Sequence, residues 1–176
     1  PDLTTNDPAR QGDSGGGLTI DNLFTWTGAV LFAIAESPVQ EGVIWTGSND
    51  GRVHVTRDGG GSWTDVSANV PGLYTESWIK GIEPSRFDAG TAYMAVSQHV
   101  DGDFAPHVFR TRDLGASWER ISAGIEESMF SFVHVVREDP KRPGMLYAGT
   151  DNQIWVTLDD GEHWSPLRLD MPPVPI

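Results

Sequence analysis

The sequence predicts an all-β fold made of about three four-stranded antiparallel β-propeller blades, which form an incomplete ring. The first observation is an eight-residue block, Thr-x-Asp-x-Gly-x-x-Trp, that begins at Thr56, Thr111 and Thr157. A block that recurs after roughly 50 residues indicates a repeat architecture. The second observation is the content of 20 glycines and 12 prolines, which favours many turns and short strands. No segment shows a helical period.

Each block, called a box below, is expected to be a hairpin turn and not a reactive centre. Glycine supplies the positive φ that tight turns need, and a turn aspartate accepts hydrogen bonds from nearby backbone N–H groups. The box tryptophan is expected to bury its ring beside the hairpin. A group that occurs three times is a poor candidate for a unique active site. The predicted structural residues are Thr56, Asp58, Gly60, Trp63, Thr111, Asp113, Gly115, Trp118, Thr157, Asp159, Gly161 and Trp164.

Around each box the sequence repeats a unit of four strands, which is one propeller blade. β-Branched and aromatic runs predict the strands, and an acidic turn with a proline separates the first from the second. The box connects the third strand to the fourth, which an apolar residue marks in each unit: Val66, Ile121 and Leu167. The first strands are predicted at 30–35, 78–82 and 132–136, the second at 43–47, 91–95 and 145–149, and the third at 53–55, 108–110 and 154–156.

The units divide the chain into blades at 29–76, 77–130 and 131–176, the last with a C-terminal lead-out toward another unit. Residues 1–28 are interpreted as the end of a preceding blade and its connecting loop. No signal peptide opens the chain, so we expect a removed leader or a piece of a longer protein. Closed propellers have at least four blades. The predicted partners are therefore other blades, from the same longer chain or from a homo-oligomer.

Composition excludes several classes of function. The net charge is −13 and the chain has two lysines, which argues against a nucleic-acid partner because phosphate binding needs clustered cations. The absence of cysteine excludes disulfides and thiolate metal sites. No apolar run is long enough for a membrane span. No Ser-His-Asp arrangement, phosphate loop or His-Glu-x-x-His segment is present either.

The second unit carries an insertion, within 97–107, between its second and third strands. His99, Asp101, Asp103 and His107 lie in it, and these residue types could ligate a metal or act as acid and base. A solvated turn is the favoured interpretation, because Asp-Gly-Asp is common in turns and the full calcium-loop pattern is missing. Calcium bound by the two aspartates remains a minor hypothesis, and the sequence predicts no other cofactor or metal.

The loop between the first and second units adds Tyr74, Glu76 and Trp78. An exposed aromatic ring beside a carboxylate suits sugar stacking and glycoside acid catalysis. Tyr74, Trp78, His99 and His107 are therefore candidate ligand-binding residues, and Asp101, Asp103 and Glu76 are candidate catalytic residues. Trp78 is also expected to begin a strand and pack.

At its boxes the chain resembles the BNR or Asp-box repeat, Ser/Thr-x-Asp-x-Gly-x-Thr/Ser-Trp. Two copies fit fully, and the third has His163 where serine or threonine is usual. The stretch 29–169 resembles bacterial sortilin-type or glycosyl-hydrolase-like BNR repeat proteins, notably at Phe32–Pro38 and Val135–Pro140. The resemblance implies a partial propeller in a secreted or periplasmic protein. The same box occurs in sialidases, endoglucanases, sortilin-like receptors and photosystem assembly factors, so it implies no single activity.

Two functions follow. The favoured one is a non-catalytic propeller segment, acting as a scaffold or as a peptide- or carbohydrate-binding surface of a larger or self-associating protein. The alternative is a fragment of a secreted, endoglucanase-like glycoside hydrolase that uses carboxylates on the loop rim opposite the boxes. Sialidase activity is disfavoured, because Arg57 and Arg112 lie inside the boxes and no arginine triad is recognisable.

Overall fold

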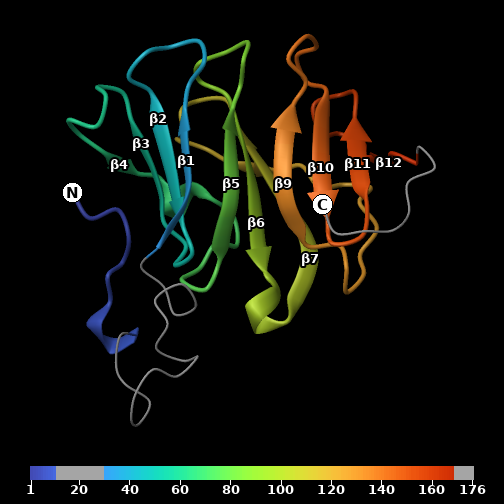
Figure 1. Cartoon of the computed structure of the whole chain (residues 1–176), viewed down its shortest axis with the longest axis horizontal. Coiled ribbons are helices and arrows are strands. Elements are labelled where there is room, and N and C mark those ends of the chain that lie inside the picture. The colour runs from blue at the N-terminus through green and yellow to red at the C-terminus, as the bar shows by residue number, and fades with distance from the viewer. Residues whose placement is uncertain (11–29, 169–176) are drawn as a thin grey trace.

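Three four-stranded antiparallel sheets stand side by side in the computed structural model, which describes residues 1–10 and 30–168 (Figure 1). Each sheet has its strands in chain order. The first sheet contains β1 (Leu31–Glu36), β2 (Ile44–Ser48), β3 (Val53–Thr56) and β4 (Thr64–Asp65). The second contains β5 (Trp78–Pro84), β6 (Ala92–Gln98), β7 (Asp103–Thr111) and β8 (Glu119–Arg120). The third contains β9 (Val133–Glu138), β10 (Leu146–Thr150), β11 (Ile154–Thr157) and β12 (Ser165–Pro166).

The first strands of the three sheets lie next to one another, since β5 contacts both β1 and β9. The strands run outward from there to the short edge strands β4, β8 and β12. Three single-turn 3₁₀ helices complete the regular structure of the described residues: η1 (Pro8–Arg10), η3 (Ser67–Asn69) and η4 (His99–Asp101). Adjacent sheets with their first strands together form the arrangement of neighbouring propeller blades, which confirms the predicted fold class.

The insertion of the second unit differs from expectation. It was predicted to be a loop, but β6 continues to Gln98 and β7 begins at Asp103, with η4 between them. Within the insertion Gln98 pairs with Asp103, and a register shift separates this pair from that of Val96 and His107. A longer hairpin satisfies backbone hydrogen-bonding groups that a loop would leave to water.

Each box closes the turn between the third and fourth strands by the same hydrogen bonds. The threonine hydroxyl accepts the backbone N–H of the box glycine and donates to the aspartate, which also accepts the backbone N–H of the seventh box residue. Donor–acceptor distances in all three boxes are 2.7–3.0 Å. Gly60, Gly115 and Gly161 have φ values of +96°, +84° and +91°, which explains the need for glycine there.

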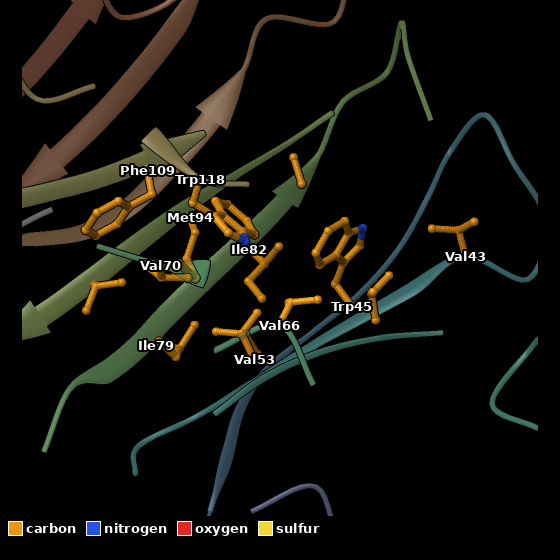
Figure 2. Close-up of a cluster of buried hydrophobic side chains, with 14 residues drawn as sticks. Val43, Trp45, Val53, Val66, Val70, Ile79, Ile82, Met94, Phe109 and Trp118 are labelled. Atoms are coloured by element: carbon orange, nitrogen blue, oxygen red, sulfur yellow. The ribbon is translucent and has the colours of Figure 1, made fainter. Parts of the chain in front are cut away.

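The hydrophobic cores lie between the sheets. One cluster joins the first sheet to the second and includes Trp45, Val53, Ile82 and Met94 (Figure 2). A second cluster joins the second sheet to the third. Each buried aliphatic or aromatic side chain contributes about 1.5–3 kcal/mol relative to an exposed one. The contacts between sheets are therefore the main source of stability.

The box tryptophans pack against the preceding sheet, not simply beside their own hairpin as the sequence suggested. Trp118 meets Trp45 edge to face at 5.8 Å between ring centroids, and the indole N–H of Trp164 donates to the Ile121 carbonyl. Trp63 has no preceding sheet among the described residues and stays partly exposed. The lead-out at 169–176 and most of the connecting segment predicted at 1–28 lie outside the described residues.

Candidate functional site

The end of the sheets where β1, β5 and β9 begin is called the strand-start rim here. It also carries the connections between second and third strands and the loops that follow the fourth strands, whereas the boxes lie on the opposite box rim. In Figure 1 the strand-start rim is the lower end, where the 3₁₀ turn between β6 and β7 projects. Loops gathered on one rim of a rigid scaffold are the usual place for binding residues.

A β-bulge occurs at the same place in all three first strands. The pairing skips Phe32 in β1, Lys80 in β5 and His134 in β9, each near the strand-start rim. A bulged residue leaves the ladder and its side chain is re-aimed, and bulges are common next to functional sites. Each of the three first strands therefore has one side chain that departs from the regular alternation between the two faces of the sheet.

A row of rings, called the aromatic row, crosses the three sheets at this rim. Phe32 meets Trp78 edge to face at 5.5 Å, and Trp78 meets His99 in the same way at 5.5 Å. His99 stacks on Phe132 at 5.0 Å. Phe104 extends the row, with its ring 6.1 Å from that of Phe132. Phe32 and Phe104 are each 37% exposed, so the row offers accessible ring surface.

Lys80 supplies a positive charge beside this row. Its ammonium lies 5.8 Å from the Phe32 ring centroid and 5.7 Å from that of Trp78, at cation–π range. Burial lowers the pKa of Lys80. Within residues 1–10 and 30–168, no carboxylate forms an ion pair with it. Its contacts in the described part of the chain are with the two rings.

A second group, the Tyr74 group, combines four of the sequence candidates. Partial burial raises the pKa of Tyr74 to about 12, and so do a hydrogen bond to Asp101 and the charges of Asp101, Asp103 and Glu76. The phenol thus lies among three carboxylates and is 39% exposed. An open hollow lined by Arg52, Leu73 and Tyr74 adjoins it.

Asp103 is already paired with a neighbour in its own strand. Its carboxylate lies 2.9 Å from Nε2 of His107, which also stacks on Phe109. His107 is 7% exposed, and burial is the main cause that lowers its pKa. Backbone and side-chain hydrogen bonds outweigh burial at Asp103 and lower its pKa. An ionised, hydrogen-bonded aspartate suits a structural contact or a base better than a proton donor.

All seven candidate catalytic and ligand-binding residues lie at or near the strand-start rim, but they belong to different groups of side chains there. Trp78 and His99 belong to the aromatic row, and Tyr74, Glu76, Asp101 and Asp103 to the Tyr74 group, while His107 lies inside the sheet. Among the described residues, no three Asp, Glu or His side chains are grouped as metal ligands would be. Sequence reasoning missed Phe32, Lys80, Phe104, Phe132 and His134. Four of these residues lie near the starts of first strands, which was a signal, and Phe104 lies in the insertion at the start of β7. The bulges could not be predicted from the sequence.

The described residues also contain no helix long and apolar enough to cross a membrane. No protein-family model matches the sequence. An oligoxyloglucan-reducing end-specific xyloglucanase from Emericella nidulans is 28% identical in an alignment of 124 residues, which covers 67% of this chain and 14% of that protein.

Solved propeller structures resemble the chain more fully. YCF48 from Cyanidioschyzon merolae aligns with 78% of this chain at a TM-score of 0.59 and 23% identity, over 37% of its own length. An ancestral GH74 enzyme aligns with 78% at a TM-score of 0.61 and 22% identity, over 18% of its length. The chain is a partial β-propeller. This chain spans about a seventh of the curated relative and well under half of either structure, and identities this low establish the fold alone.

Proposed function

We propose that this partial propeller is a non-catalytic binding segment of a secreted or periplasmic Asp-box repeat protein, with the aromatic row as its ligand surface. The observation that carries the proposal is the continuous contact of Phe32, Trp78, His99 and Phe132 across three sheets. Binding sites combine apolar, mostly aromatic surface with a few polar groups, here Lys80 and His134. Rings that stay partly exposed suit stacking against the apolar face of a sugar.

Carbohydrate is the favoured ligand and peptide the second. The similarity to a xyloglucanase and to GH74 enzymes supports a glucan. A structure described as YCF48 bound to D1 peptide resembles this chain at a TM-score of 0.58 and 18% identity, and supports a peptide. In both cases the rings would supply contact area and Lys80 a charged or hydrogen-bonding contact.

Binding can be tested by calorimetry with xyloglucan oligosaccharides and with a set of unstructured peptides. Phe32→Ala and Phe104→Ala are expected to weaken binding about tenfold each, because each removes an exposed ring from the row. Phe87→Ala is the matched control, since Phe87 is 43% exposed in the turn after β5 at the box rim. Equal losses in all three variants, or no binding to either class, would contradict the proposal.

A glycoside hydrolase fragment remains the alternative, favoured by the xyloglucanase similarity and by the carboxylates around Tyr74. Glycosidases use two carboxyl groups, one of which must donate a proton. Hydrolysis of β-glucans by the purified chain, lost in Asp101→Asn and Asp103→Asn, would establish the alternative. Binding without turnover would support the non-catalytic role.

A further inference from the structure

A hollow of about 230 Å³, called the junction hollow here, lies between the second and third sheets at the strand-start rim. The loop after β8 and the turn between β10 and β11 line it with Glu126, Ser128, Phe130, Asn152 and Gln153 (Figure 1). None of these side chains belongs to the aromatic row. We propose that the junction hollow is a second binding site, which takes one neutral pyranose ring of a carbohydrate.

Side chains of the chain itself occupy the corresponding place between the first and second sheets. Tyr74 and Ser128 begin the same turn, since each donates its backbone N–H to the hydroxyl of the serine three residues later, at 3.1 and 2.8 Å. At the first junction that serine is Ser77, and it also accepts the side-chain amide of Gln98 at 2.7 Å. At the second junction it is Ser131, which donates to two backbone carbonyl groups. The junction hollow thus lies where a small serine replaces a tyrosine.

The polar side chains of the junction hollow keep unused hydrogen-bonding groups. Among the residues that the structure describes, none forms a hydrogen bond or an ion pair with the Glu126 carboxylate or the Gln153 side-chain amide. The Asn152 amide oxygen accepts the Thr150 hydroxyl at 3.1 Å, which leaves its NH₂ group as a donor. The Ser128 hydroxyl accepts a backbone N–H at 3.1 Å and keeps its own proton to donate. The hollow therefore offers both acceptors and donors.

This mixture of groups favours a neutral polyol over an ion. A guanidinium or ammonium group only donates hydrogen bonds, so the amide NH₂ groups of Asn152 and Gln153 would find no acceptor on it. A carboxylate or phosphate group would meet the like charge of Glu126. A sugar hydroxyl both donates and accepts, and several hydroxyls around one ring can use all of these side chains.

Two aromatic side chains supply apolar contact for such a ring. Phe130 is 46% exposed, and Trp155, which is 4% exposed, also lines the hollow. Aromatic surface with a few polar groups is the usual composition of a small-molecule site. The volume is below the range of about 300–1,000 Å³ that is typical for drug-sized ligands, so a single sugar ring is the fitting size.

The inference extends the proposed carbohydrate binding to a place outside the aromatic row, and NMR titration of the 176-residue chain can test it there. The probes are the methyl glycosides of glucose, galactose and xylose. At least one is expected to bind with a dissociation constant of about 1–10 mM, as suits so small a ligand. The largest changes in chemical shift should occur at Asn152, Gln153 and the loop after β8.

Two polar substitutions and one that fills the space examine the junction hollow itself. Gln153→Leu and Glu126→Ala should each raise the dissociation constant about fivefold, because each removes hydrogen bonds to the sugar. Ser128→Tyr introduces the side chain that the first junction has at this position and should abolish binding. Glu127→Ala is the matched control, since Glu127 is a neighbouring exposed carboxylate outside the lining of this hollow. The spectra of the variants show whether each is folded.

The proposal is overturned if none of the three glycosides shifts signals at the junction hollow. It is equally overturned if folded Ser128→Tyr and Gln153→Leu bind as the wild type does. Stronger binding of propylguanidinium than of any glycoside would mean that the hollow recognises a cationic side chain instead. Phe32→Ala, which alters the aromatic row, should leave binding in the hollow unchanged, so failure of one site is distinguishable from failure of the other.

Discussion

At the scale of single residues, the third box shows which side-chain hydrogen bond all three boxes share. Ser62 and Ser117 donate their hydroxyls to the box aspartates at 2.6 Å. His163 occupies that place in the third box, and its Nδ1 lies 2.8 Å from the Asp159 carboxylate. The departure from the usual motif therefore keeps a side-chain hydrogen bond to the aspartate. The required property is a donor of suitable reach.

Loss of a box aspartate should destabilise the protein. Asp113 accepts hydrogen bonds from the Ser117 backbone, the Ser117 hydroxyl and the Thr111 hydroxyl. Asp113→Ala removes the acceptor of all three. We expect a loss of about 1–3 kcal/mol in the free energy of unfolding, measured by urea denaturation. Glu126→Ala, in the exposed loop after β8, should change it by less than about 0.5 kcal/mol. Equal free energies of unfolding for the two variants would show that the box aspartate does not stabilise the turn.

The box carboxylates also predict sensitivity to acid. Hydrogen bonds from Thr157 and His163 lower the pKa of Asp159 to about 2, and similar bonds lower the pKa of Asp58 and Asp113. A lowered folded-state pKa adds stability above the unfolded value of about 3.9, and this stability disappears as the pH falls toward the folded value. The melting temperature should therefore fall between about pH 4 and pH 2, and less steeply in Asp159→Asn. If the melting temperatures of the variant and the wild type fall in parallel with pH, the Asp159 carboxylate is not a source of the acid sensitivity.

At the scale of strands, close approach between sheets explains one glycine. A Cβ added at Gly47 in β2 would overlap the side chain of Ile79 in β5. Gly47→Ala should cost about 1–3 kcal/mol by overpacking, as measured by thermal unfolding. Gly81→Ala is the control, because no atom lies within 4 Å of an added Cβ there. If steric conflict is the cause, Ile79→Ala should relieve part of the Gly47→Ala effect.

The strands show how much of the fold could be predicted from the sequence. Box spacing and apolar runs predicted the number and order of the twelve strands, because the turn chemistry is local. The β6–β7 hairpin was missed, since the polar insertion resembles a loop until cross-strand pairing is known. The bulges at Phe32, Lys80 and His134 depend on pairing between segments and have no local signature. The aromatic row therefore became visible only in three dimensions.

At the scale of the whole molecule, each sheet is stabilised mainly by its neighbours, as in other repeat proteins. The second and third sheets share several polar contacts in addition to their apolar cluster, among them a tie at Glu138. Glu138 in β9 accepts hydrogen bonds from the Ser85 hydroxyl at 2.9 Å and the Arg86 backbone at 2.8 Å. Arg110 adds an ion pair to Asp160 at 2.7 Å. These contacts couple unfolding of the third sheet to that of the second.

Removal of the tie should loosen the third sheet specifically. Glu138→Ala leaves the buried Ser85 hydroxyl and the Arg86 N–H without their acceptor, which should cost about 1–3 kcal/mol. Glu36→Ala removes the register counterpart in β1, which is exposed, and should leave the stability nearly unchanged. Hydrogen exchange should show faster opening of β9–β11 than of β1–β3 in Glu138→Ala. Uniform acceleration in all three sheets would instead mean that the array unfolds as one cooperative unit, with stability shared across both interfaces.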